Sequence, residues 1–184
     1  MPDGSTTALL FPGQGSQAAG MGCALAERYH VARQTFEEAN DILGYDLARL
    51  CFDGPEEDLN ETSNTQPALY VAGVAALRTL YELIGESFTP ACTAGHSLGE
   101  LTALTAAGAL SFPDGLRLVR RRGELMRDAD KASPGGMAAL LGVELSQVQA
   151  MCDEAQSQVG GVLVIANDNC PGQIVIAGND APLT

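Results

Sequence analysis

The sequence predicts an α/β protein with a parallel sheet, followed by a smaller unit of one strand, a helix and two strands. Three observations predict this class. Short apolar runs alternate with longer stretches whose apolar residues repeat at helical spacing. A glycine-rich turn at residues 95–99, Gly-His-Ser-Leu-Gly, links one such run to an Ala/Leu-rich helix. After residues 133–136, Ser-Pro-Gly-Gly, the pattern changes to strands around a single helix.

In the first part of the chain, strands are expected where short apolar runs end in glycine-rich loops, and helices where apolar residues repeat every three or four positions. A turn at 53–59 feeds an acidic helix start, because carboxylates complement the positive end of a helix. The expected elements are strand 9–11, loop 12–17, helices 18–33 and 34–50, the buried Ala-rich helix 67–84, strand 89–94, and helices 97–110 and 112–130.

The second part is expected to hold strands at 137–143, 161–166 and 173–177, with a helix at 146–158 between the first two. Strand, helix, strand and strand form a compact unit that can pack one sheet face against the helix. The sequence therefore predicts a large core over residues 1–132 and a small subdomain over residues 133–184.

Composition excludes several functional classes. The 184 residues can bury one substantial core plus part of a second lobe. A net charge of −13 would repel phosphates, so we expect no nucleic-acid partner. The apolar runs are interrupted before the length of a membrane span, and residues 1–4 lack the basic flank of a signal peptide. We therefore expect a cytoplasmic protein without a membrane segment.

The five cysteines lie far apart, and none has the spacing of metal ligands. We expect reduced, mostly structural thiols and no metal. The basic residues, in contrast, are clustered, because six of the ten lie between Arg117 and Lys131. This cluster is either a solvated helix face or a surface for phosphates or for an acidic partner.

The turn at 95–99 has the chemistry of a nucleophile elbow. Ser97 would lie at its tip, with the hydroxyl exposed above a helix N-terminus. A Cβ at Gly95 or Gly99 would collide with the neighbouring strand or helix. The N–H of Leu98 would point at the place where a tetrahedral oxyanion forms. By itself the turn indicates a serine hydrolase or transferase.

Six ordered segments resemble the malonyl-CoA:acyl carrier protein transacylase family, which includes acyltransferase domains of polyketide synthases. They are residues 13–17 (GQGSQ), 65–69 (TQPAL), 95–100 (GHSLGE), 122–123 (RG), 136–139 (GMAA) and 169–178 (NCPGQIVIAG). The resemblance spans nearly the whole chain. It implies an α/β-hydrolase-like core with a nucleophile elbow, and the start of a ferredoxin-like small subdomain.

The resemblance also implies roles for particular residues. Ser97 would be the nucleophile, and the backbone N–H groups of Gln14 and Leu98 would stabilise the oxyanion. Arg122 would bind the free carboxylate of a malonyl group through its planar guanidinium, and the glycine that follows it favours this register over the two preceding arginines. Gln66 and Asn169 match positions near the acyl pocket.

The implied activity is transfer of a malonyl group from malonyl-CoA to the phosphopantetheine thiol of acyl carrier protein, through an acyl-serine, in fatty-acid or polyketide synthesis. No cofactor is implied, because malonyl-CoA is the substrate. Methylmalonyl or another extender unit stays open. Two alternatives also remain: a hydrolase that clears acyl groups from carrier proteins with the same serine, and a fragment that docks carrier protein through the basic helix without turnover.

A serine nucleophile needs a base, and the two histidines of this chain fit poorly. His96 precedes Ser97, so its side chain should point away, and His30 lies on an early surface helix. The resemblance places the catalytic histidine, further core strands and the rest of the subdomain in a following segment. We therefore expect the 184 residues alone to be nearly inactive, and the remainder of the enzyme to be a partner.

Overall fold

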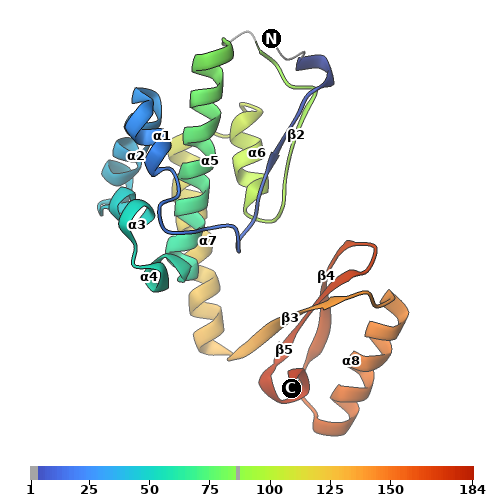
Figure 1. Cartoon of the computed structure of the whole chain (residues 1–184). Coiled ribbons are helices and arrows are strands. Elements are labelled where there is room, and N and C mark those ends of the chain that lie inside the picture. Colours follow the sequence, from blue (N-terminus) through green and yellow to red (C-terminus); the bar gives the residue numbers. More distant parts are fainter. Residues whose placement is uncertain (1–3, 86–87) are drawn as a thin grey trace. The chain divides into compact units, whose positions relative to one another are not determined.

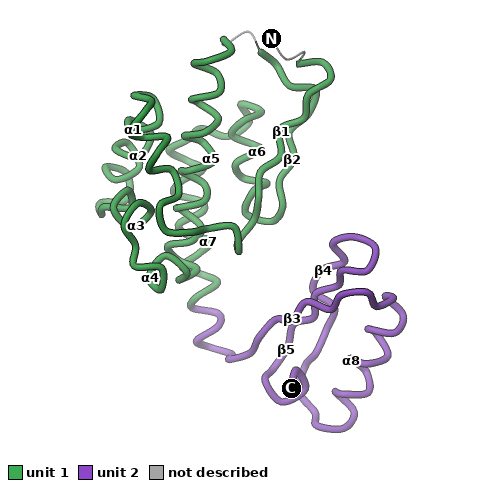
Figure 2. Tube along the Cα trace, viewed as in Figure 1, with its two compact units in different colours: residues 1–127 green, residues 128–184 purple. Residues whose placement is uncertain are grey.

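The computed structural model describes residues 4–85 and 88–184, and the chain divides into two compact units, Met1–Arg127 and Asp128–Thr184 (Figure 2). Residues 1–3, which begin the segment expected to lack a signal peptide, lie outside the described residues. The division falls inside α7 (Phe112–Ala132), five residues before the expected boundary at 132/133. Each unit has its own sheet and its own core.

The sheet of the first unit is parallel, as predicted. β1 (Ala8–Phe11) pairs with β2 (Cys92–Gly95), and Phe11 lies opposite Gly95. α6 (Gly99–Ala106) packs against both strands (Figure 1). Because the strands are parallel, their C-terminal ends meet at one edge, so the loop after β1 and the turn after β2 lie side by side.

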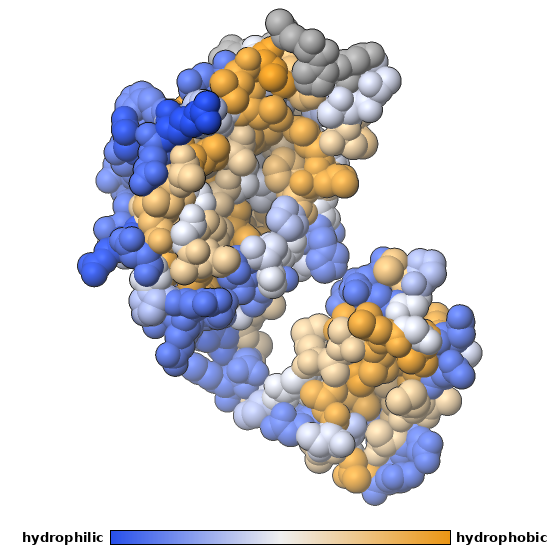
Figure 3. Space-filling model, viewed as in Figure 1, coloured by the Kyte–Doolittle hydropathy of each residue, from blue (hydrophilic) through white to orange (hydrophobic). Residues whose placement is uncertain are grey.

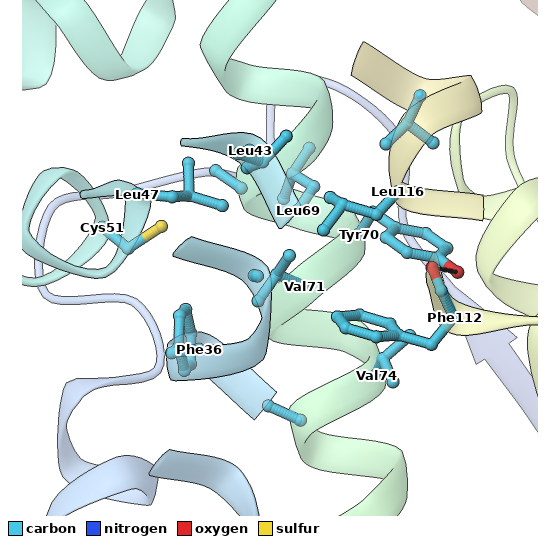
Figure 4. Packing of buried hydrophobic residues seen from close by; sticks show 14 of the residues in the cluster. Phe36, Leu43, Leu47, Cys51, Leu69, Tyr70, Val71, Val74, Phe112 and Leu116 are labelled. Atoms are coloured by element: carbon cyan, nitrogen blue, oxygen red, sulfur yellow. Dashed lines mark hydrogen bonds between the residues drawn. The ribbon is translucent and has the colours of Figure 1, made fainter. Parts of the chain in front are cut away.

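Helices supply most of the core of this unit, and α5 (Thr62–Ile84) is their centre, with α2, α3, α4 and α6 packed against it. Tyr70 of α5 is fully buried, and its ring stacks on Phe112 with centroids 5.7 Å apart (Figure 4). The Tyr70 hydroxyl donates to the Phe112 carbonyl oxygen at 3.2 Å. The other helices are a short 3-10 helix at Gly4–Thr6, α1 (Cys23–Arg28), α2 (His30–Leu43), α3 (Leu47–Asp53) and α4 (Glu56–Asn60).

The predicted helices at 18–33 and 34–50 are wrong in their limits. Tyr29 is extended, with φ −121° and ψ 124°, and separates α1 from α2. Gly44, with φ 75°, ends α2 before α3 begins. The helical periodicity was correct, but no glycine or proline marks the break at Tyr29.

The central helix also begins earlier than predicted. α5 starts at Thr62, so Pro67 lies inside the helix instead of at its start. A proline there forgoes one backbone hydrogen bond. The helix continues through it because Gln66, Pro67 and Ala68 are all buried, and burial outweighs one lost bond.

α5 is the helix that bears on the expectation of no membrane segment. By length and composition alone it is long and apolar enough to cross a membrane, and 44% of its most apolar window is buried within the protein. A buried core helix passes the same test, and α5 contributes Ala68, Tyr70, Val71, Val74 and Ala75 to the core of the first unit.

The second unit has the predicted strand, helix, strand and strand order. It consists of β3 (Gly135–Leu141), α8 (Leu145–Val159), β4 (Leu163–Cys170), β5 (Gln173–Asn179) and the short α9 (Asp180–Leu183). The antiparallel sheet has the order β3-β5-β4, so β5 lies between the strands that α8 connects. The mixed α/β fold class is therefore confirmed, with a parallel sheet in one unit and an antiparallel sheet in the other.

The sheet of the second unit is apolar on both faces. Val148 and Cys152 of α8 are buried against Leu163, Ile174 and Ile176. The opposite face carries exposed apolar side chains, visible as orange atoms on this unit in Figure 3, and they include Met137, Leu141 and Val164. A solvated antiparallel face is usually polar, so this face is unusually hydrophobic.

The cysteines differ in exposure, and this difference predicts their reactivity. The five thiols are free; Cys51 and Cys152 are buried, whereas Cys92 and Cys170 are exposed. Burial raises the pKa of Cys51 to about 12, and burial also raises the pKa of Cys152. The thiolate is the reactive form. Alkylation of the folded chain at mildly alkaline pH should therefore label Cys92 and Cys170 but neither buried thiol, as read by peptide mass mapping.

Unfolding the chain in denaturant before alkylation serves as the control, since Cys51 and Cys152 should then react as fully as the exposed pair. Labelling of Cys51 at the rate of Cys92 in the folded protein would contradict this prediction.

Candidate active site

Ser97 lies at the tip of a sharp turn between β2 and α6. Its φ of +52° is the single positive φ found at a non-glycine among the described residues. Such a conformation costs about 1–3 kcal/mol and persists only where the surroundings impose it. The N–H of Gly99 donates to the His96 carbonyl oxygen at 2.9 Å, so helical bonding begins directly after the serine. The predicted nucleophile-elbow geometry is present.

Close backbone contacts impose this turn. A Cβ on Gly95 would overlap the backbone of Gly99. A Cβ on Gly99 would overlap the carbonyl oxygen of Phe11 and would lie 2.8 Å from that of Pro12. The predicted need for glycine at both positions is therefore correct, and the two glycines let the elbow approach the loop after β1.

That loop places Gln14 beside the elbow. The His96 N–H donates to the Phe11 carbonyl oxygen at 3.1 Å, and the backbone of Gly13 lies against His96. The Gln14 side chain turns away and donates to the Thr62 hydroxyl at 3.2 Å. In the part of the chain that the structure describes, the N–H groups of Gln14 and Leu98 have no protein acceptor, so both can donate to an anion.

Arg122 of α7 reaches Ser97. Its Nη2 donates to the Ser97 hydroxyl oxygen at 2.9 Å, and its Nη1 donates to Gln66 Oε1 at 2.8 Å. Gly123 allows this approach, because a Cβ there would lie 2.8 Å from the Thr62 carbonyl oxygen of α5. Among residues 4–85 and 88–184, no carboxylate forms an ion pair with Arg122. Its charge is therefore available to an anion beside the serine.

The two preceding arginines do not share this arrangement. Arg120 pairs with Glu124 at 3.1 Å and also donates to the Leu43 carbonyl oxygen at 2.8 Å. Arg121 pairs with Glu124 at 3.4 Å. The hydrogen bond from Arg120 is the main cause that lowers the pKa of the Glu124 carboxyl. Arg122 is thus the arginine of this triplet that faces the elbow.

Gln66 is fully buried, and both ends of its amide are bonded. Oε1 accepts from Arg122, and Nε2 donates to the Met126 sulfur at 3.0 Å. The sequence interpretation placed Gln66 near the acyl pocket but did not identify Met126. The available signal was its spacing, because Met126 follows Arg122 by four residues and so lies on the same face of α7.

Asn169 lies in the second unit, on β4, where its side-chain amide donates to Gln173 Oε1 at 3.3 Å. The other predicted site residues, Ser97, Leu98, Gln14, Gln66 and Arg122, all belong to the first unit, and the structure brings them together. A role for Asn169 at the acyl pocket stays a prediction.

The other candidate groups lie away from this arrangement. His30 begins α2, and its Nδ1 lies 2.8 Å from Arg33 Nη2. No group of three or more His, Cys, Asp and Glu side chains in the described residues could hold a metal ion. A cavity of about 900 Å³ is lined by residues of α5, β2 and the end of α6, among them Arg78, Tyr81 and Cys92, but by no predicted site residue.

Comparison with known proteins agrees with these features. Residues 8–184 match the model of the acyl transferase domain family. The chain is 47% identical over 174 residues to the malonyl CoA-acyl carrier protein transacylase of Bacillus subtilis, covering 95% of this chain and 54% of that protein. The chain therefore spans about half the length of this curated relative.

Solved structures show the same similarity. The chain superposes on the malonyl-CoA:acyl carrier protein transacylase of Xanthomonas oryzae with a TM-score of 0.89 and 50% identity, covering 99% of this chain and 57% of that one. It also superposes on a malonyl-transacylase solved in complex with a type II polyketide synthase acyl carrier protein, with a TM-score of 0.86 and 44% identity, covering 96% and 56%. With its elbow, the glycine-rich loop after β1 and this match over residues 8–184, the chain belongs to the acyl transferase domain family.

Proposed function

We propose that this chain carries the nucleophile and the carboxylate-binding site of an acyl carrier protein S-malonyltransferase. The observation that carries the proposal is Arg122, whose guanidinium bonds the Ser97 hydroxyl and has no carboxylate partner in the described protein. A cation held beside a nucleophile suits an acyl group that itself ends in a carboxylate. The relatives named for malonyl transfer support the same substrate.

The proposed reaction has two acyl transfers. Ser97 Oγ attacks the thioester carbonyl of malonyl-CoA, the carbon–sulfur bond breaks, and coenzyme A leaves as its thiol. The phosphopantetheine thiol of acyl carrier protein then attacks the malonyl-serine ester, and the serine hydroxyl is released. The proton that Ser97 loses in the first step passes through a general base to the sulfur of the leaving coenzyme A.

The N–H groups of Leu98 and Gln14 would stabilise the oxyanion formed in each transfer. Both lie at the ends of the paired strands, next to Ser97, and neither is used within the described protein. Losing one such donor typically costs about 3–4 kcal/mol of transition-state stabilisation. This part of the proposal needs no cofactor, and malonyl-CoA enters only as substrate.

Acyl carrier protein is the proposed second substrate, with fatty-acid and polyketide synthesis both open. A relative solved in complex with its carrier protein supports this partner. We also retain a cytoplasmic location in the proposal, without nucleic acid or membrane as partners. Arg122 favours transfer over the alternative of an editing hydrolase, because a neutral acyl group would leave its charge unused.

The preference of the site for a malonyl group can be tested by binding measurements, because binding, unlike attack by Ser97, requires no general base. Titration calorimetry should show tighter binding of malonyl-CoA than of acetyl-CoA, and Arg122→Ala should remove this preference. Hydrogen bonds to a charged group contribute about 1.5–3 kcal/mol, which corresponds to a loss of about 10- to 100-fold in malonyl-CoA affinity. Binding of acetyl-CoA should be almost unchanged.

Arg121→Ala is the matched control, since Arg121 lies on the same helix but pairs with Glu124 and is exposed. The control should retain the malonyl preference. Equal affinities for the two thioesters in the unmodified protein, or an unchanged preference after Arg122→Ala, would rule out the proposed carboxylate site. Binding of carrier protein without any thioester preference would favour the docking alternative.

A further inference from the structure

Three consecutive hydrogen bonds connect Met126 to Ser97, the proposed nucleophile. The Met126 sulfur accepts from Gln66 Nε2 at 3.0 Å, Gln66 Oε1 accepts from Arg122 Nη1 at 2.8 Å, and Arg122 Nη2 donates to Ser97 Oγ at 2.9 Å. All four residues belong to the first unit. Gln66, which takes part in two of these hydrogen bonds, is fully buried, with 0% of its surface exposed.

The chemistry of these groups fixes the direction of the Gln66 amide. A guanidinium has only donors, so Arg122 requires the oxygen of the amide. The nitrogen then points the other way, and a thioether sulfur can only accept. A flipped amide would set donor against donor at Arg122 and acceptor against acceptor at Met126. Both neighbours therefore select the same orientation.

Two residues of α7 hydrogen-bond the Gln66 side chain. Arg122 and Met126 are four residues apart on this helix and so lie on one face, while Gln66 comes from α5. Met126 is 43% exposed as a whole, yet its sulfur reaches a fully buried amide. Because Gln66 is fully buried, water cannot replace the sulfur as an acceptor. Removal of the sulfur would therefore leave a buried N–H without an acceptor.

We propose that Met126 is a positioning residue for the carboxylate site. Its sulfur holds the Gln66 amide in one orientation, and that amide holds the Arg122 guanidinium with one nitrogen directed at Ser97. Met126 thereby contributes to the preference for malonyl without touching the substrate. This inference rests on the proposed function, in which Arg122 binds the malonyl carboxylate.

The test replaces the sulfur and then restores an acceptor. Met126→Leu keeps a similar apolar volume but has no acceptor, whereas Met126→Gln supplies an oxygen acceptor on a chain of similar length. A hydrogen bond of ordinary strength corresponds to a factor of about 3 to 10. We expect Met126→Leu to weaken malonyl-CoA binding by that factor, to leave acetyl-CoA binding unchanged, and to be rescued by Met126→Gln. Met151→Leu, at an exposed methionine of α8, is the control.

A second readout is independent of substrate. In ¹⁵N-labelled protein, the Gln66 side-chain N–H signals should exchange slowly with solvent; Met126→Leu should shift them and speed their exchange, and Met126→Gln should slow it again. A merely structural methionine would weaken both thioesters equally and would not be rescued by glutamine.

The two proposals fail in different ways. Equal affinities of the unmodified protein for malonyl-CoA and acetyl-CoA would overturn the proposed function. The Gln66 amide signals alone would then decide whether Met126 orients this amide. Unchanged amide signals in Met126→Leu, or equal losses for malonyl-CoA and acetyl-CoA, would overturn the positioning role.

Discussion

Replacement of Ser97 by alanine is expected to abolish covalent acylation of this chain by malonyl-CoA while leaving the protein folded. The hydroxyl is the proposed attacking group, and loss of a serine nucleophile lowers acyl-transfer rates by about 10³-fold or more. Alanine keeps a Cβ at the same left-handed φ of +52°, so the backbone strain of the turn is not changed. Because no base for Ser97 is expected within these residues, acylation of the unmodified chain should be slow. Intact-mass spectrometry after prolonged incubation should still show one malonyl adduct on the unmodified chain and none on Ser97→Ala.

Two controls separate this adduct from unspecific transfer. Ser157→Ala changes an exposed serine of α8 and should leave the adduct in place. Exposed Cys92 and Cys170 can also accept an acyl group, but the resulting thioesters are removed by an excess of small thiol, whereas a serine ester is not. A thiol-resistant adduct on Ser97→Ala would show that Ser97 is not the nucleophile.

The parts of the fold that sequence could predict are those encoded by neighbouring residues. β1, the elbow and α7 were placed almost correctly because apolar runs, glycine flanks and helical spacing lie within a few residues of one another. Gly123 indicated, for a similar reason, which arginine reaches Ser97: a glycine directly after Arg122 marks a close approach, and α5 approaches there. Local steric requirements survive folding, so local patterns predict them.

The errors lie where distant contacts decide. No glycine or proline lies directly before the break at Tyr29. Pro67 led to a predicted start of α5 at residue 67, whereas the helix begins at Thr62. α2 and α5 pack against each other, so contacts between residues far apart in the sequence act on both helices. Intrinsic propensities differ by less than about 1 kcal/mol for ordinary residues, so tertiary contacts readily override them.

The site shows the same limit. Ser97 and Arg122 were identified individually, but the bond from Gln66 to Met126 could not be predicted, because it joins side chains 60 residues apart. The four-residue spacing places Met126 on the face of α7 that carries Arg122, but it does not show that Gln66 of α5 lies there. Their pairing follows from the contact of α5 and α7 at Gly123 and Thr62.

Gly99→Ala is expected to destabilise the protein by about 3 kcal/mol or more. Alanine in a helix is normally better than glycine by about 1 kcal/mol, so propensity alone predicts the opposite sign. Steric overlap decides, because the added Cβ meets the carbonyl oxygens of Phe11 and Pro12. These are backbone atoms at the end of β1 and in the loop after it, and they cannot rotate away. Urea unfolding followed by circular dichroism measures the change.

Gly73→Ala is the matched comparison within the same unit. Gly73 lies inside α5, and a Cβ there would meet the Thr102 methyl group at 3.0 Å, a side-chain atom that can move by a few tenths of an ångström. The helix gain and the small contact cost should nearly cancel, so its stability should change by less than about 1 kcal/mol. If Gly99→Ala, like Gly73→Ala, lowers the free energy of unfolding by less than about 1 kcal/mol, the elbow tolerates a larger residue. A large loss confined to Gly99 would show that the backbone of the elbow is pressed against the loop that carries Gln14, which is the contact that brings both proposed oxyanion donors to Ser97.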